Sequence, residues 1–229
     1  MPSLYDDESG VIRALVDRLG QDLEPSILIG GWATFVRVGG EISLDIDLIT
    51  SQESRHKLEQ LMTDLSPSNN HQGRKLRATI NHVHLDIYLP FESQLGGKLR
   101  LKVEVLAEYP DELSFEKWTL LRLEAHIATK MAALLDRHFS EKGQKDAREI
   151  LTLVKLEGVD PTLAAEVLDR ASTVGIEDLP AMIGDAFDLI GKIINLSKAE
   201  QKLIAAAKKS WVAELQRRGA QPQTTRPSL

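Results

Sequence analysis

The spacing of apolar residues divides the chain into a first half of short mixed elements and a second half of helices. Short apolar runs and strict alternation of apolar and polar positions predict strands. These strands are expected at 27–29, 42–49, 74–80, 82–89 and 98–106. Apolar residues three and four positions apart predict helices, which are expected at 7–19, 32–38 and 53–65, with a polar loop at 66–70.

From about residue 114 onward glycine becomes sparse and helical spacing dominates. The helices expected in this half are 117–136, 144–156, 161–171, 178–194 and 198–217. We therefore predict an α+β fold in which a mixed sheet precedes a helical domain. The expected domains are 1–110 and 111–218, followed by a flexible tail at 219–229.

Composition excludes several classes of protein. The chain has 229 residues and no cysteine, which rules out disulfides, thiol nucleophiles and cysteine-based metal sites. No apolar stretch approaches the ~20 residues that a membrane helix requires, so we expect no membrane partner. The acidic first residues hold no apolar signal segment, so we expect a cytoplasmic protein. A net charge of −6 argues against a broad nucleic-acid-binding surface but is compatible with a local basic groove.

Two aspartates, Asp45 and Asp47, lie on the strand expected at 42–49. Because side chains alternate along a strand, the two carboxylates share one face, whereas Leu44 and the apolar residues that alternate with the aspartates face the core. Like charges this close repel each other unless a cation lies between them. Mg²⁺ prefers such oxygen ligands and completes its coordination with substrate phosphates and water.

A glycine pair and a third aspartate extend this pattern. Gly30 and Gly31 lie between a strand and a helix, where backbone amides can approach an anion without a side chain in the way. Alternation at 82–89 places Asp86 on the polar face of its strand. If the two aspartate strands are neighbours, three carboxylates with two metals could clamp an in-line phosphoryl displacement.

Other interpretations of these residues remain open at this point. An Asp-x-Asp pair also occurs in metal-dependent glycosyltransferases, and two aspartates on an exposed edge strand are common. His82 and His84, on the same strand face as Asp86, could indicate zinc or simply a solvated face. The combination of strand, glycine pair, short helix, Asp-x-Asp strand and later single-aspartate strand is what favours phosphoryl transfer.

The segments Ile29-Gly30-Gly31-Trp32-Ala33 and Ser43-Leu44-Asp45-Ile46-Asp47-Leu48 resemble the signature of the polymerase-β-like nucleotidyltransferase superfamily. These two segments are most similar to the AbiEii/AbiGii toxin branch of the superfamily. Residues 129–137 and 145–150 are similar to two later motifs of that branch, so the resemblance covers about 27–153. One position departs from the pattern: Glu41 stands where the family usually has arginine, and Arg37 is a candidate replacement.

The resemblance implies a nucleotidyltransferase core followed by a helical domain. It implies an Mg²⁺-dependent enzyme, the toxin of a toxin–antitoxin or phage-defence pair, that transfers a nucleotide from an NTP to RNA such as a tRNA 3′ end. A cognate antitoxin is then an expected partner. The implied catalytic residues are Asp45, Asp47, Asp86, Lys130 and Asp146, of which the first three would bind metal. The implied nucleotide-binding residues are Gly30, Gly31, Ser43 and Lys130.

Two alternatives to this function are open. The same chemistry could modify a protein or a small hydroxylated molecule such as an aminoglycoside. The chain could also be a non-catalytic binding module that keeps the fold, although the three intact aspartates argue against it.

Lys130 is the one charged member of an apolar stripe on the helix expected at 117–136. A helix that is apolar on two sides is mostly buried, so its lysine needs a partner. Asp146 and a bound triphosphate are both candidate partners. A third interpretation is a lysine whose stem is buried while its ammonium reaches solvent.

A second group of cations comprises Lys98, Arg100 and Lys102. Alternation along the strand expected at 98–106 places all three on one face. They could guide an RNA backbone, or they could form a solvated face balanced by Glu104.

Overall fold

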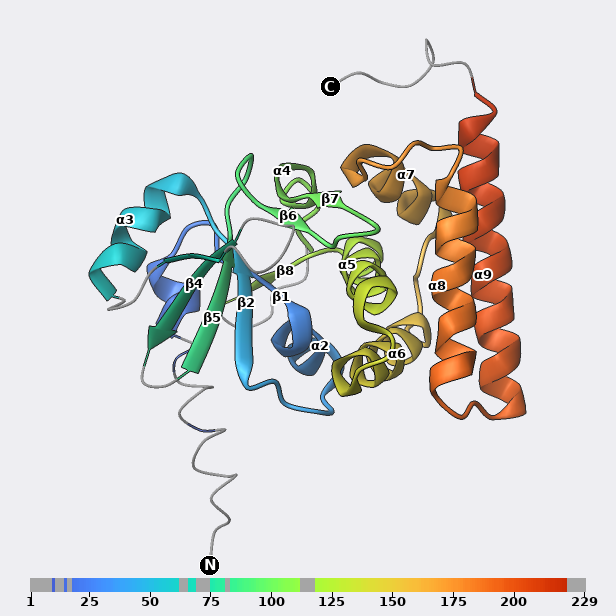
Figure 1. Cartoon of the computed structure of the whole chain (residues 1–229), viewed down its shortest axis with the longest axis horizontal. Helices are drawn as coiled ribbons and strands as arrows, with labels where there is room; N and C mark the ends of the chain where they lie inside the picture. Colours follow the sequence, from blue (N-terminus) through green and yellow to red (C-terminus); the bar gives the residue numbers. More distant parts are fainter. Residues whose placement is uncertain are drawn as a thin grey trace, which may run out of the picture. The chain divides into compact units, whose positions relative to one another are not determined.

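The computed structural model describes residues 10, 15, 18–61, 66–68, 75–80, 83–111 and 118–221. The chain forms two compact units (Figure 1). Unit 1 comprises residues 1–94 and 102–122, and unit 2 comprises residues 95–101 and 123–229. The chain therefore leaves unit 1, contributes a short segment to unit 2, and returns to unit 1 before it enters the long helices.

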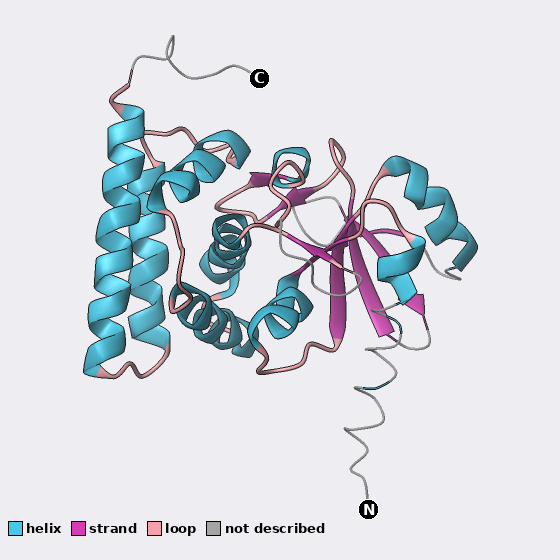
Figure 2. Ribbon diagram, turned by 180° about the vertical axis from the view of Figure 1, so that it is seen from behind, coloured by secondary structure: helices cyan, strands magenta, loops and turns pink. Residues whose placement is uncertain are grey.

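Unit 1 is built on a mixed six-stranded sheet with the order β3-β4-β5-β2-β1-β8, drawn in magenta in Figure 2. Its strands are β1 (Ile27–Ile29), β2 (Asp45–Ile49), β3 (Ser66–Ser68), β4 (Lys75–Ile80), β5 (Val83–Tyr88) and β8 (Thr119–Leu120). β2 is parallel to β5 and β1 is parallel to β8, whereas the other neighbours are antiparallel. The helices α2 (Gly30–Val38), α3 (Gln52–Leu61) and α4 (Val103–Leu106) belong to the same unit.

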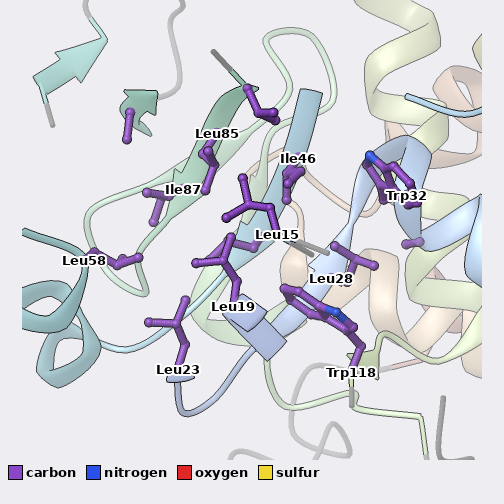
Figure 3. Close-up of a cluster of buried hydrophobic side chains, with 14 of the residues drawn as sticks. Leu15, Leu19, Leu23, Leu28, Trp32, Ile46, Leu58, Leu85, Ile87 and Trp118 are labelled. Carbon is purple, nitrogen blue, oxygen red and sulfur yellow. The ribbon is translucent and has the colours of Figure 1, made fainter. Parts of the chain in front are cut away.

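The core of unit 1 is formed by the apolar residues that alternate along its central strands. Ile46 of β2 and Leu85 of β5 are fully buried, and they lie in a cluster with Trp32 and Trp118 (Figure 3). The prediction that Leu44 also faces the core is wrong, because Leu44 is 65% exposed. The strand begins one residue later, so Leu44 belongs to the preceding loop.

Unit 2 consists of α5 (Leu123–Arg137), α6 (Glu141–Val154), α7 (Pro161–Ala171), α8 (Leu179–Ile193) and α9 (Lys198–Gly219), together with residues 95–101. Ser140, Asp160 and Ser197 cap α6, α7 and α9, each accepting a hydrogen bond from a first-turn backbone N–H. α8 and α9 lie side by side as a helical hairpin (Figures 1 and 2).

The predicted α+β class is confirmed, but three segments differ from the sequence-based expectation. Instead of a strand at 98–106, the chain forms β7 (Leu101–Lys102), which pairs with β6 (Gln94–Leu95) and is followed by α4. Val103 and Leu106 are both buried, and their three-residue separation is helical spacing. The helix expected from 117 begins at Leu123, because β8 pairs with β1. Part of the expected loop at 66–70 is strand β3.

Some expectations fall outside the described residues. The predicted helix at 7–19 lies there for the most part, as do residues 222–229 of the predicted tail. Within the described ranges, none of the helices combines the length and the apolar character needed to span a bilayer.

Two substitutions test the position at which β2 begins. We expect Ile46→Ala to lower the free energy of unfolding by about 2–5 kcal/mol, because it empties a fully buried site. Leu44→Ala should change it by no more than about 0.5 kcal/mol, because Leu44 is exposed. Urea unfolding of both variants measures the difference. Equal losses would contradict the strand boundary.

Candidate active site

The three predicted aspartates lie on one face of the unit 1 sheet. β2 and β5 are parallel neighbours, and their register places Asp47 opposite Asp86 and Asp45 opposite His84. Residues in register across a sheet point to the same side, so the carboxylates share the face opposite the apolar core. Asp45 and Asp47 are half-buried and Asp86 is buried. The sequence pattern therefore predicted the correct face, and the condition that the two aspartate strands are neighbours is met.

Asp47 lies against the first residue of α2. Gly30 has φ +70°, and a Cβ added to it would come within 2.9 Å of Asp47 Cβ and Cγ and would overlap the carboxylate. Glycine is required here for its backbone conformation and for the close approach. The residue before the helix, Ile29, provides no side-chain cap, and the first turn carries no acidic residue. The first-turn amides of α2 and the Asp47 carboxylate are therefore adjacent, so a metal-bound phosphate could use both.

Asp86 is engaged by two cations of β4. Lys75 Nζ donates to Asp86 Oδ2, and Arg77 Nε donates to Asp86 Oδ1 at 3.0 Å. Arg77 is the residue directly opposite Asp86 in the antiparallel β4–β5 pair. The hydrogen bond to Asp86 and the charge of that carboxylate raise the pKa of the Arg77 guanidinium, and the charge of Asp45 adds to the rise. The acidic face is thus partly neutralised from within unit 1.

The remaining predicted residues of unit 1 have simpler surroundings. Gly31 is buried in the first turn of α2, and Ser43 is half-buried in the loop that precedes β2. Arg37, the candidate replacement for the arginine missing at Glu41, is almost buried; it pairs with Asp111 at 2.7 Å and donates to the Leu121 carbonyl. These contacts join α2 to Asp111 and Leu121, near the last residues of unit 1, and so give Arg37 a structural role.

Lys130 and Asp146 belong to unit 2, where they form a network of four charges. Lys130 is only 4% exposed; its Nζ donates to Glu149 Oε2 and lies 3.7 Å from Asp146 Oδ1. Arg137 binds Asp146 with two hydrogen bonds of 2.7 and 2.9 Å. Two cations therefore balance two carboxylates across the α5–α6 contact. The interpretation of Lys130 as a lysine that reaches solvent is wrong.

The predicted RNA patch does not form a strand face. Lys98 and Arg100 lie in the loop before β7 and belong to unit 2, whereas Lys102 ends β7 and belongs to unit 1. The loop is fixed by Asp136, whose carboxylate accepts hydrogen bonds from the N–H groups of Gly97 and Lys98. Alternation along 98–106 was misleading because only two of those residues are in a strand.

Two of the three aspartates on the carboxylate face, Asp45 and Asp47, are suitable ligands for a metal ion. Within the described ranges, no three His, Cys, Asp or Glu side chains come together as a metal-binding group. Each oxygen of Asp86 accepts a hydrogen bond from a cation, Lys75 or Arg77, and these positive charges oppose the approach of a metal ion to Asp86 in this arrangement. Asp45 and Asp47 fit Mg²⁺ on their own, because this ion uses one or two carboxylates and takes its other ligands from phosphates and water. The zinc interpretation involves His82, which lies outside the described residues.

Sequence reasoning missed two partners in these charge networks. Glu149 is the direct partner of Lys130, and Lys75 is a direct partner of Asp86. The signal for Glu149 was available, because residues three apart on a helix share a face and Asp146 was already a candidate. The signal for Lys75 required the antiparallel register of β4 and β5.

Comparison with known proteins adds little beyond the overall likeness. No protein-family model matches the sequence, and no curated protein matches it. One similar solved structure is a "putative nucleotidyltransferase" from H. pylori, at 13% identity and a TM-score of 0.47, covering 95% of this chain and 99% of that one. Another is an antigenic nucleotidyltransferase-like protein from Paracoccidioides brasiliensis, at 16% identity and a TM-score of 0.43, covering 84% and 95%. At identities and TM-scores this low, the likeness says nothing of activity.

A double-mutant cycle tests the contact between Gly30 and Asp47. Gly30→Ala should destabilise unit 1 by more than the about 1–2 kcal/mol that a left-handed backbone costs an L-residue, because the new Cβ displaces the carboxylate. Asp47→Ala in the same chain should recover part of that loss. Gly39→Ala is the matched control, since Gly39 also has a positive φ but no atom lies near its Cβ position. Additive effects of the two substitutions in urea unfolding would contradict the contact.

The network in unit 2 predicts a large stability effect at Lys130. Lys130→Met leaves Glu149 as a buried, uncompensated carboxylate, so we expect a loss of about 3–5 kcal/mol. Adding Glu149→Leu should restore most of it, because the isolated charge is then removed. Thermal and urea unfolding measure both effects. A Lys130→Met protein of normal stability but without activity would instead favour contact with the triphosphate.

Proposed function

We propose that this chain is an Mg²⁺-dependent nucleotidyltransferase that moves a nucleotide from an NTP to an acceptor. The observation that carries the proposal is the position of Asp47 against Gly30 at the start of α2, with Asp45 on the same face of β2. Carboxylate oxygens and first-turn amides meet there, and a metal-bound triphosphate needs both kinds of group.

In this proposal Asp45 and Asp47 hold the metal, and the start of α2 receives phosphate oxygens. Gly30 and Gly31 would allow that approach, and Ser43, which lies in the loop before β2, would contribute its hydroxyl to phosphate binding. When bound, Mg²⁺ would neutralise the triphosphate and stabilise the charge that develops during in-line displacement. The leaving group is then pyrophosphate, and the nucleotide becomes attached to the acceptor hydroxyl.

Asp86 is the carboxylate proposed to face the acceptor. It would take the proton of the attacking hydroxyl as a base, or hold a second metal. Each oxygen of Asp86 now accepts a hydrogen bond from Lys75 or Arg77, so either role is favoured when one of these cations moves away. A bound substrate with phosphate groups offers the two cations another anion, so this exchange conserves ion pairing.

The proposed acceptor is RNA, with a tRNA 3′ end as the first choice, and the proposed biological role is that of a toxin with a cognate antitoxin. The support for this part is the resemblance of residues 27–153 to the AbiEii/AbiGii branch. Lys130 and Asp146, which that resemblance places in catalysis, are so far explained by the buried network in unit 2.

Removal of either metal-binding aspartate should abolish transfer. Asp45→Ala and Asp47→Ala should each lose Mg²⁺-dependent labelling without loss of stability, because they remove a ligand and also relieve like-charge repulsion. The assay follows radioactive NTP into total RNA and into protein, with and without Mg²⁺. Asp185→Ala, at an exposed carboxylate of α8, is the control and should label like the wild type.

Each outcome of this assay has a definite meaning. Full turnover in the Asp45 or Asp47 variant would overturn the active-site assignment. Labelling of protein but not RNA by the wild type would keep the chemistry and replace the proposed acceptor. No labelling of any acceptor with any NTP would overturn the proposed function.

A further inference from the structure

An exposed aromatic ring lies at the junction of α5 and α6 in unit 2. Phe139 is 94% exposed, and its ring centroid is 3.8 Å from that of His138. A single exposed apolar residue is common on protein surfaces. The surroundings of Phe139 distinguish it, because they are cationic.

Helix α6 carries a row of cations. Lys142, Lys145 and Arg148 are three residues apart in sequence, so they are neighbours along one side of the helix. Lys142 and Arg148 are exposed and Lys145 is half-buried. Two of the three acidic residues of α6, Asp146 and Glu149, are buried in the charge network.

A second segment brings two more cations to the same end of α5. The N–H groups of Gly97 and Lys98 donate to the Asp136 carboxylate at 2.6 and 2.8 Å, and Asp136 is three residues before Phe139. Arg100 Nε donates to the Gly97 carbonyl at 3.0 Å, which closes the loop on itself. The exposed side chains of Lys98 and Arg100 are therefore carried by a loop that is hydrogen-bonded to the end of α5.

We propose that this surface, defined by Phe139 with Lys98, Arg100, Lys142, Lys145 and Arg148, binds single-stranded RNA. Cations that follow a backbone and an exposed ring on which an unpaired base can stack are the two elements of such binding. An acidic segment of a protein would satisfy the cations but would not use the ring. The chain carries a net charge of −6, so a local concentration of cations is where a polyanion can approach it.

The inference rests on the proposed function in one respect only, namely that the bound RNA would be the acceptor of the nucleotide. Binding itself requires no NTP and no metal. The surface lies in unit 2, whereas the proposed catalytic aspartates lie in unit 1, so the two assignments use different residues and different assays.

The test is binding of a fluorescent oligouridylate of about 12 nucleotides, measured by anisotropy without NTP over a range of salt concentrations. We expect Phe139→Ala to weaken binding about tenfold, because it removes the stacking platform. We expect Lys142→Gln with Lys145→Gln to reduce the slope of log affinity against log salt by about 0.7 for each phosphate that is no longer neutralised. A duplex of the same length should bind independently of Phe139, because its bases are already stacked.

Matched controls lie elsewhere on the chain. Phe91→Ala removes an aromatic ring that is 87% exposed in unit 1. Lys202→Gln with Lys209→Gln removes two exposed lysines of α9 and therefore changes the net charge equally. Neither control should alter binding of the oligouridylate. Controls that weaken binding as much as the test variants would overturn the assignment.

The remaining outcomes separate the two proposals. If Phe139→Ala has no effect while poly-glutamate competes as well as RNA, the surface binds acidic protein and the RNA proposal is overturned. If Asp45→Ala binds RNA normally but labels nothing, both proposals are supported. If the wild type transfers no nucleotide and yet binds RNA through Phe139, the surface stands and the transferase assignment falls.

Discussion

Repulsion between carboxylates on neighbouring strands is the constraint on which the arrangement of unit 1 depends. Parallel pairing of β2 and β5 sets Asp47 opposite Asp86, with the strands about 5 Å apart. Like charges directly opposite each other destabilise a sheet. The sheet therefore needs cations, and β4 provides two of them against Asp86. Asp45 and Asp47 lie on the side away from β4, where Gly30 leaves room for the Asp47 carboxylate.

Unit 2 also contains neighbouring carboxylates whose repulsion is balanced by cations, and there the carboxylates are buried. Asp146 and Glu149 of α6 form ion pairs with Lys130 and Arg137 of α5. Buried charges without partners cost several kcal/mol, so each member of the network depends on the others. Replacing such a network by well-packed apolar residues is often neutral for stability, so we expect its main contribution to be the alignment of α5 with α6 that pairs every charge. The double substitution at Lys130 and Glu149 separates these two contributions.

Sequence patterns predicted which face of a strand a residue occupies better than they predicted its interaction partners. Alternation placed Asp45, Asp47 and Asp86 on one side of their strands, because burial of one sheet face enforces a period of two. Alternation failed at 98–106, where a two-residue strand is followed directly by the short helix α4. The apolar residues of this segment fit both the two-residue period of a strand and the spacing of a helix. Helical spacing makes both Asp146 and Glu149 candidate partners of Lys130, but it does not decide which of the two accepts the hydrogen bond. Lys75 became a partner only through the register of β4 against β5.

The buried network also determines which residues of α6 meet solvent. An α-helix turns about 100° per residue, so rotating α6 by one position would expose Glu149 or bury one of its outer cations. The ion pairs of Lys130 and Arg137 with this helix oppose such a rotation. The orientation of Lys142, Lys145 and Arg148 is therefore linked to the ion pairs that this helix makes with α5. A variant that breaks the network should disturb RNA binding through α6 even though it alters no residue of the Phe139 surface, whereas a variant that replaces the whole network by apolar residues and keeps the packing should not.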